Sequence, residues 1–299
     1  MIDLRYHIYS LAAVFLALAL GIAIGACVAP GKWSHDEMAR RQAQIRQLES
    51  RFDSLRQEIS ERDQALSEAR LQIDDAEKVC QALLPIAVKG RLAGRNVALI
   101  QTGGSDEAVA DVRTVLEHAG AKVTALVKIE PAARPDGKKA ASAALALGLD
   151  PESTERDRFS AILSMIAEAI VWARGSDRLS IIEQHEIITV TGQTNRWNRL
   201  VVVVGGADAP KRDRSAAVDA PLAALLRDEG AEVVGCERSD AKVSYVPAHA
   251  GNGISTVDSI DRAAGQIGLI YALCGERGHF GIKRTSDRLI PRTLERLGS

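Results

Sequence analysis

The 299 residues include 38 lysines and arginines against 39 aspartates and glutamates, so the formal net charge is -1. A near-neutral chain without a basic block lacks the positive surface that nucleic-acid binding requires, and we expect no nucleic-acid partner. The four cysteines are scattered without a CxxC pair, so the sequence indicates neither a disulfide framework nor a zinc site. They are Cys27, Cys80, Cys236 and Cys274.

Residues 1–31 are predicted to form a transmembrane anchor. No charged side chain lies between Ile8 and Gly31. About 20 helical residues at about 1.5 Å each cross the roughly 30 Å of a bilayer core, so this run is of membrane length. Gly21 and Gly25 form a GxxxG pair, which lets two helices approach closely in lipid. No later apolar run reaches membrane length, which excludes a multi-span carrier.

Two alternatives to an uncleaved anchor stay open. The segment has features of a signal peptide, and residues 24–27 resemble a lipobox that would end in a lipidated Cys27. The apolar run exceeds the 7 to 15 residues that are usual in a signal peptide, and only Arg5 precedes it as a fixed cation, beside Asp3. These features favour the anchor.

Membrane orientation depends on the charges that flank the span. Four cations follow it: Lys32, Arg40, Arg41 and Arg46. Positive residues tend to remain in the cytoplasm, so charge alone slightly favours a cytoplasmic carboxyl-terminal part.

Residues 32–89 are predicted to form a coiled-coil stalk. Apolar residues recur at the 3,4,3,4 spacing of heptad a and d positions for nearly six heptads, and Arg62 interrupts the seam. We expect self-association as a dimer or trimer through this seam, whose main residues are Ile45, Leu48, Phe52, Leu55, Ile59, Leu66 and Ile73, followed by Cys80 and Leu83. Residues 38–84 would extend about 70 Å as one helix.

Residues 90–299 are predicted to form an α/β domain with a Rossmann-like parallel sheet. Two βαβ repeat units, residues 95–130 and 197–240, each start with an apolar strand that ends in a Gly-Gly pair. The unbroken valines at 201–204 are typical of a strand buried on both faces. The paired glycines lie 102 positions apart whereas the later Gly120 and Gly230 lie 110 apart, so the second unit has eight extra residues in its 207–215 loop.

Further elements are predicted between and after the repeats. A helical insert covers residues 151–186, where Thr154 and Asp157 resemble a capping box. Residues 187–191 and 243–246 are expected to be strands. Residues 261–273 are expected to form a helix capped by Asp261.

The Gly-Gly pairs are weak candidates for an anion or nucleotide site. Each pair stands between a strand and a helix amino terminus, where free N–H groups favour negative charge. The four residues are Gly103, Gly104, Gly205 and Gly206. Neither loop completes a nucleotide-binding motif, and tight turns also require glycine. The GxSxG and HExxH motifs are absent, so we expect no enzymatic activity, with an anchored nucleotide-binding sensor or enzyme as an alternative.

A metal site is predicted from the remaining thiols and imidazoles. Cys236 ends the second strand of the second repeat, and Cys274 ends the helix that precedes the turn with His279. Two thiolates and an imidazole would suit Cu(I). The alternative interpretation is that these side chains are a buried thiol and a turn residue.

The chain closely resembles the MctB family, which is named for a mycobacterial copper transport protein. The resemblance rests on the opening residues 1–21, MIDLRYHIYSLAAVFLALALG, with Gly25, and on the later stretches Gly205-Gly206, 255–261 and 278–281. It implies a single span, a coiled coil and then an α/β domain outside the cytoplasm. It also implies a role in copper transport or copper homeostasis, which makes copper the candidate ligand and leaves direct binding open. A coiled-coil envelope scaffold without copper binding is the alternative that the residues support equally well.

Overall fold

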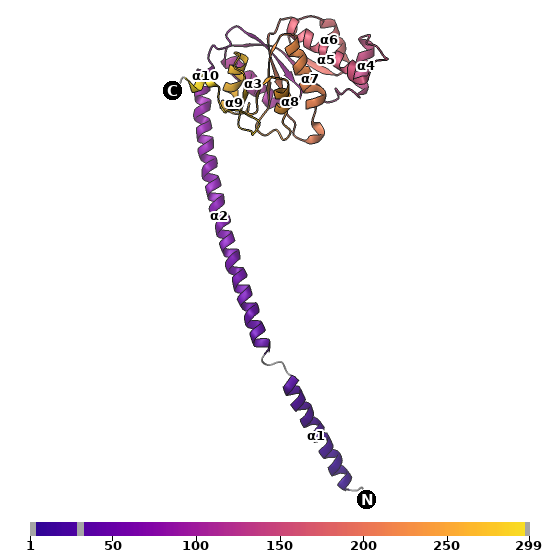
Figure 1. The fold of residues 1–299 in the computed structure, drawn as a ribbon, viewed down its shortest axis with the longest axis vertical. Coiled ribbons are helices and arrows are strands. Elements are labelled where there is room, and N and C mark those ends of the chain that lie inside the picture. Colours follow the sequence, from indigo (N-terminus) through magenta and orange to yellow (C-terminus); the bar gives the residue numbers. More distant parts are fainter. Residues whose placement is uncertain (1–3, 29–32, 297–299) are drawn as a thin grey trace. The chain divides into compact units, whose positions relative to one another are not determined.

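The computed structural model describes residues 4–28 and 33–296, which form two compact units, one up to Ile73 and one from Asp74 onward (Figure 1). The predicted border between anchor and stalk, at residues 31 and 32, lies outside the described residues. Each unit is treated by itself below.

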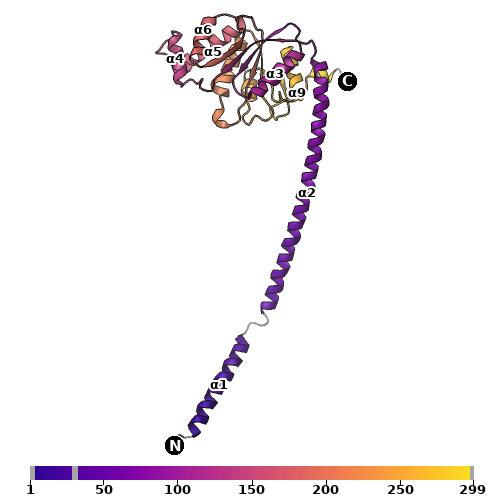
Figure 2. The same ribbon diagram turned by 180° about the vertical axis from the view of Figure 1, so that it is seen from behind.

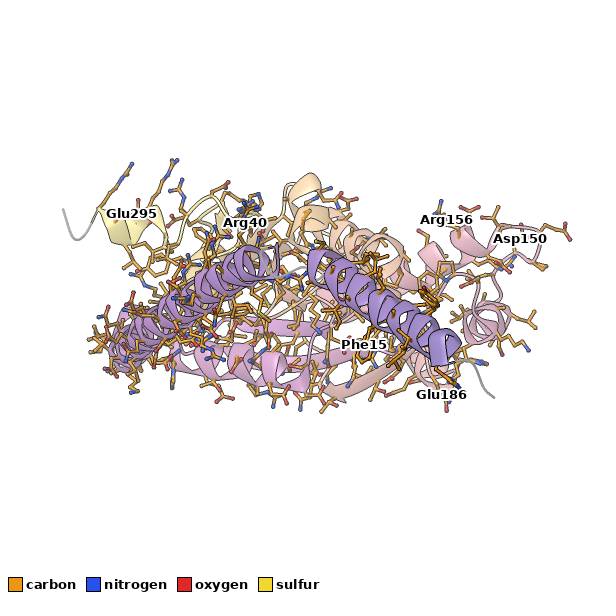
Figure 3. The ribbon with its side chains drawn as sticks, turned by 90° about the horizontal axis from the view of Figure 1, so that it is seen from below. Phe15, Arg40, Asp150, Arg156, Glu186 and Glu295 are labelled. Atoms are coloured by element: carbon orange, nitrogen blue, oxygen red, sulfur yellow. The ribbon has the colours of Figure 1, made fainter. Side chains whose placement is uncertain are left out.

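The first unit consists of helices. The helix α1 (Leu4–Val28) contains the stretch His7–Cys27, which is long and apolar enough to cross a membrane. Its apolar side chains, Phe15 among them, are exposed and project from the helix on all sides (Figure 3). The helix α2 (Trp33–Val88) comprises 56 residues, and its seam side chains from Ile45 to Ile73 are exposed.

The end of α2 belongs to the second unit. Leu84 and Val88 are buried in the core of that unit, and the Glu77 Oε1 accepts a hydrogen bond of 2.7 Å from the Ala263 backbone N–H. Leu83, beside them in the sequence, is 55% exposed. The helix continues through Pro85 to Val88, so the last turns of the predicted stalk are part of the α/β unit.

A seven-stranded sheet in the order β3-β2-β1-β4-β5-β6-β7 forms the centre of the second unit. The strands are β1 (Asn96–Gln101), β2 (Lys122–Ile129), β3 (Ile188–Gly192), β4 (Leu200–Val204), β5 (Glu232–Cys236), β6 (Ser255–Val257) and β7 (His279–Phe280). The pairing is parallel except between β2 and β3, which confirms the predicted parallel sheet. Equivalence of the two βαβ units as a Rossmann-like repeat stays a prediction.

Helices cover both faces of the sheet (Figures 1 and 2). One face packs against α4 (Lys138–Ala146), α5 (Glu155–Trp172), α6 (Ser176–Gln184) and α7 (Ala220–Asp228), and the other against α3 (Asp106–His118), α9 (Ala263–Leu273) and the end of α2. Alternate residues of one strand face opposite layers: Val201 and Val203 join the first core, and Val202 and Val204 the second. Short helices α8 (Val246–Gly251) and α10 (Arg292–Glu295) complete the unit.

Several local predictions can be compared with these elements. The Thr154 Oγ1 accepts from the Asp157 N–H at 3.2 Å, so the predicted cap of α5 is confirmed. The predicted strand at 243–246 is wrong, because Val243 forms only an isolated bridge with Ala207 and Val246 begins α8. The predicted cap of α9 by Asp261 is wrong, because the N-cap residue of this helix is Arg262. The Asp261 carboxylate instead accepts hydrogen bonds from the N–H and the hydroxyl of Ser239.

Candidate functional site

A cavity of about 880 Å³ opens where the strand order of the sheet reverses. The strands β1 and β4 are neighbours there, and each continues beyond the sheet into its Gly-Gly pair. All four glycines line the cavity together with Thr102 and Ser105. In open α/β sheets, ligands bind outside the carboxyl ends of the strands at such a reversal point.

The two Gly-Gly loops pack directly against each other. A Cβ atom on Gly103 would collide with the carbonyl oxygen of Gly206, and the Gly104 N–H donates to that oxygen at 2.7 Å. The Gly103 N–H donates to Val204 O at 3.2 Å, and the Gly205 N–H to Cys236 O at 2.8 Å. Three of the four glycine N–H groups are therefore engaged within the protein. Close approach of the backbones accounts for these glycines, and a bound anion would have to meet other groups.

Basic side chains surround the cavity. Six cationic residues line it, namely Lys128, Arg134, Arg212, Arg214, Arg238 and Lys242, whereas its carboxylates are Asp106, Asp208 and Asp240. Six positive against three negative side chains give a local charge of +3 in a chain whose net charge is -1. This corner of the protein is therefore electropositive.

The three carboxylates are each paired with a cation. Lys128 lies 3.1 Å from Asp106, Arg212 lies 3.0 Å from Asp208, and Arg238 lies 3.3 Å from Asp240. The Gln101 amide and then the Lys128 ammonium, which both bond the Asp106 carboxylate, lower its pKa. Arg134, Arg214 and Lys242 have no carboxylate within ion-pair distance in the part of the chain that the structure describes.

Arg214 joins the ends of two strands. Its guanidinium donates to the carbonyl oxygen of Glu130 at 2.6 Å, to that of Ile129 at 3.2 Å, and to that of Thr102. Burial lowers the pKa of this guanidinium, because charge is costly away from water. The Arg214 N–H also donates to the Tyr245 hydroxyl at 2.9 Å. These bonds fix the 207–215 loop so that the Arg214 guanidinium lies at the carboxyl ends of β1 and β2.

A buried ion pair lies beside the Gly-Gly loops. The Nε2 of His249 is 2.6 Å from Oδ2 of Asp219, and both side chains are fully enclosed. Asp219 also accepts a hydrogen bond from the Thr102 hydroxyl. Burial acts to lower the pKa of His249, but the negative charges of Asp219 and Glu237 outweigh it and raise the pKa overall. The imidazole lies against Gly235, where a Cβ atom would be 2.5 Å from its Cδ2.

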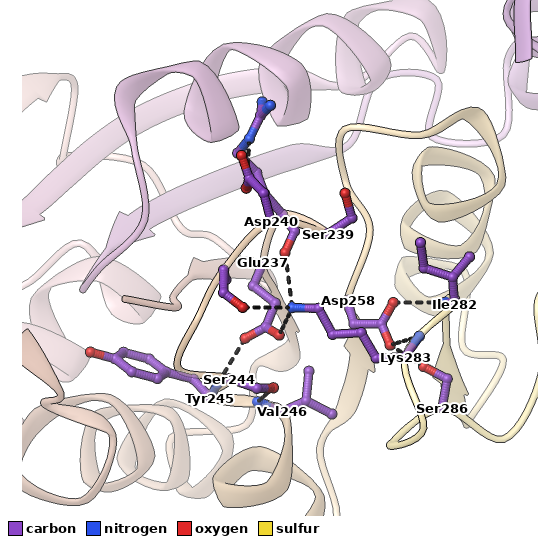
Figure 4. Close-up of polar contacts among 12 residues, drawn as sticks. Glu237, Ser239, Asp240, Ser244, Tyr245, Val246, Asp258, Ile282, Lys283 and Ser286 are labelled. Atoms are coloured by element: carbon purple, nitrogen blue, oxygen red, sulfur yellow. Dashed lines mark hydrogen bonds and ion pairs between the residues drawn. The ribbon is translucent and has the colours of Figure 1, made fainter. Parts of the chain in front are cut away.

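A second polar cluster follows β5 and β6 (Figure 4). The Lys283 ammonium lies 2.6 Å from Oε1 of the buried Glu237, whose Oε2 accepts from the Tyr245 N–H at 2.7 Å. The buried Asp258 accepts from the N–H groups of Ile282 at 2.8 Å and Lys283 at 3.0 Å, and from the Ser286 hydroxyl. These carboxylates are engaged by protein donors and hold the 282–286 loop onto the sheet.

The structure does not bring Cys236, Cys274 and His279 together. Cys236 is the last residue of β5 and is buried, and burial raises the pKa of its thiol. Cys274 lies at the opposite edge of the sheet, since its Sγ is 3.6 Å from the carbonyl oxygen of Arg91, which precedes β1. A strand of five residues is about 16 Å long, so the two thiols are widely separated.

His279 lies elsewhere again. In the strand register, His279 of β7 pairs with Thr256 of β6, and Thr256 pairs with Gly235 of β5. His279 therefore lies level with the end of β5 but two strands away, a distance of roughly 10 Å across the sheet. Its Nδ1 is 2.9 Å from the Thr256 hydroxyl. Among the residues with described side chains, no group of three histidines, cysteines or acids could hold a metal ion. The expectation that both thiols lie at one rim of the sheet is therefore corrected: α9 runs back across the sheet and ends at its amino edge.

Sequence reasoning missed the residues that define the cavity. Arg212 and Arg214, which line the cavity, lie within the 207–215 loop of the second βαβ repeat, the loop that the spacing of the glycines predicts to be longer. The eight extra residues were the available signal, because an insertion beside a strand end at the reversal point adds side chains to the site. The partners of Arg214, which are backbone carbonyls of other strands, carry no sequence signal.

These features define a class: a protein with an apolar amino-terminal helix of membrane length, a long polar helix with an exposed apolar seam, and a mixed α/β unit. The family described as "Copper transport outer membrane protein, MctB" matches residues 1–291, and the chain belongs to this MctB family. Proteins named "Copper transporter MctB" from Mycobacterium bovis and from two strains of Mycobacterium tuberculosis are 28% identical to it over 314 residues. The alignments cover 94% of this chain and 96% of each relative.

Proposed function

We propose that this chain is a single-pass membrane protein of copper transport and copper homeostasis that acts as an oligomer. In this proposal the α/β unit lies outside the cytoplasm and catalyses no reaction. One observation carries the proposal: the likeness to proteins named copper transporters extends over 94% of the chain, and the family match over residues 1–291 includes both helices and the sheet. A likeness confined to one domain would support much less.

The exposed seam of α2 supports the oligomer. Leu55 is 53% exposed and Ile59 is 58% exposed, with further apolar residues at the same heptad positions before and after them. Burial of apolar surface contributes about 25 cal/mol per Å², so a seam of this length favours a second copy over water. A coiled coil satisfies this requirement when the same face of each helix meets its partner.

Copper is the cargo in this proposal, and the described residues offer no preassembled three-ligand group for it. Ligation by all three of Cys236, Cys274 and His279 would require a rearrangement, since strand pairing fixes Cys236 and His279 and the end of α9 fixes Cys274. A second candidate function follows from the exposed seam of α2 and from the lack of a preassembled copper ligand group among the described residues. An exposed seam without a copper ligand set favours a coiled-coil scaffold that positions other envelope proteins.

The test is the copper content of cells that lack the protein, of cells that carry the wild type, and of cells that carry Leu55→Asp with Ile59→Asp. We expect loss of the protein to change cell copper while zinc stays constant, and the double variant to behave like the loss. Unchanged copper in cells without the protein would reject the copper role and leave the scaffold. If loss of the protein changes cell copper and the double variant returns it to the wild-type level, only the need for the oligomer would be rejected.

A further inference from the structure

We propose that the cavity at the carboxyl ends of β1 and β4 binds a phosphate-bearing anion of about nucleotide size, through the side chains of Arg134, Arg214 and Lys242. This site is separate from the copper role and does not depend on it.

The first argument is charge. Each acidic residue of the lining already has a cationic partner. In contrast, Arg134, Arg214 and Lys242 have no carboxylate within ion-pair distance among the described side chains. Burial is the largest influence on the pKa of Arg214 and lowers it, and the positive charge of Arg134 lowers it further, against opposing effects of Tyr245, Asp219 and Glu130. Like charges held together repel each other, and an anion between them removes this repulsion while gaining charge-assisted hydrogen bonds.

The second argument is the position of Arg214. A long cation could turn towards water, but this guanidinium is held by three backbone carbonyls at the ends of β1 and β2. These acceptors are neutral, so they orient the group without cancelling its charge. Arg134 and Lys242 are exposed, so both can reach a ligand that enters the cavity from solvent.

The third argument is the space. A cavity of about 880 Å³ lies within the range of small-molecule sites, roughly 300 to 1,000 Å³. The four glycines lining it add no side chains that would obstruct it. The lining contains no cysteine, histidine or methionine, and its excess positive charge would repel Cu(I). The ligand class that fits is therefore an anion.

The size and charge of the cavity favour two or more linked phosphate groups over a single one. Arginine and lysine both bind phosphate, arginine through two parallel hydrogen bonds. Such groups occur in free nucleotides and diphosphates and also in phosphorylated lipid headgroups. The probes therefore cover both sources: inorganic pyrophosphate, ADP, and the soluble lipid dioctanoyl phosphatidylinositol 4-phosphate.

The experiment is calorimetric titration of the full chain in detergent micelles with each probe. We expect saturable binding of at least one probe, near one per chain. Arg134→Gln with Lys242→Gln should weaken that binding about tenfold or more, because two charge-assisted contacts are lost. Both residues are exposed and have no ion pair among the described residues, so the melting temperature should not change. Arg134→Lys with Lys242→Arg should restore the binding.

The matched control is Lys89→Gln with Lys122→Gln, which removes the same charge from exposed residues at the amino ends of the strands, away from the cavity lining. We expect this control to change the affinity less than about twofold, because distant surface charges are screened by salt. Binding of pyrophosphate or ADP alone would identify a free phosphate compound, and tighter binding of the lipid would identify a headgroup. Failure of all three probes to bind, or equal weakening in the control, would overturn the proposal.

Discussion

The long helix α2 and the central sheet use the same kinds of apolar residue in opposite surroundings. Val201 to Val204 are buried from both sides by helices of their own chain, whereas Leu55 and Ile59 are more than half exposed. The sheet completes its core within one chain, because the chain returns repeatedly to cover both faces. A single helix cannot cover its own seam. The comparison teaches that the α/β unit is folded by itself, while α2 is expected to be complete only in an assembly.

The largest expected effect is on assembly. Leu55→Asp with Ile59→Asp places charges in the seam, and we expect the full chain in detergent to change from an oligomer to a monomer in sedimentation. The α/β unit should keep its unfolding midpoint, since both residues belong to the other compact unit. A wild-type chain that sediments as a monomer at tens of micromolar would show that the seam has another role.

Cys80 sharpens the same prediction. It is exposed, free, and at a predicted seam position, so parallel copies in register would bring their Cys80 thiols within disulfide range. Mild oxidation should then produce a covalent dimer that Cys80→Ser abolishes and Cys274→Ser does not. An antiparallel arrangement predicts no such bond.

The next effect concerns the buried pair in the α/β unit. Asp219→Ala should reduce the free energy of unfolding by about 3 kcal/mol or more, since it leaves His249 enclosed without its partner and removes the acceptor of Thr102. This loss is measured by denaturant unfolding, with the fluorescence of Trp172 and Trp197 as the signal. Asp228→Ala, at an exposed ion pair with Arg227, is the matched control and should cost much less.

The His249–Asp219 pair should also make the free energy of unfolding depend on pH. The size of this dependence should not exceed the loss that Asp219→Ala causes. The pKa of His249 is raised above its ordinary 6.5 in the folded state. The charged pair therefore contributes its full stability below about pH 6.5, and this contribution is lost as the pH rises through the folded pKa. Unfolding midpoints across that range should fall for the wild type and stay flatter for His249→Gln. The same slope in both proteins would assign it to other groups.

A smaller effect is expected from packing at the sheet. Gly235→Ala adds a methyl group 2.5 Å from the His249 ring and should cost about 1 to 3 kcal/mol of unfolding free energy. Gly251→Ala, in the neighbouring α8, meets nothing within 4 Å and should be nearly neutral. Equal costs for the two would contradict the close packing at Gly235.

The smallest effect is the loss of a helix cap. Thr154→Ala removes the side-chain acceptor of the Asp157 N–H at the start of α5, and should cost about 1 kcal/mol. Thr154→Ser keeps the hydroxyl and serves as the control. A midpoint of thermal unfolding that does not change between the two variants would mean that the cap contributes nothing.

The sequence by itself determined the apolar span, the long heptad-patterned helix, the parallel strands and the cap of α5, because each depends on residues close together in the chain. Strand edges were less certain: residues 243–246 have the composition of a strand, but they form a turn into α8. The tertiary structure alone decided that Cys236 and Cys274 lie at opposite ends of the strands, and that one cavity collects three cations without an ion pair in the described part of the chain. Such outcomes depend on strand order and on where each crossover helix ends. Residues far apart in the chain meet there through backbone carbonyls and packing, which leave no periodic trace in the sequence.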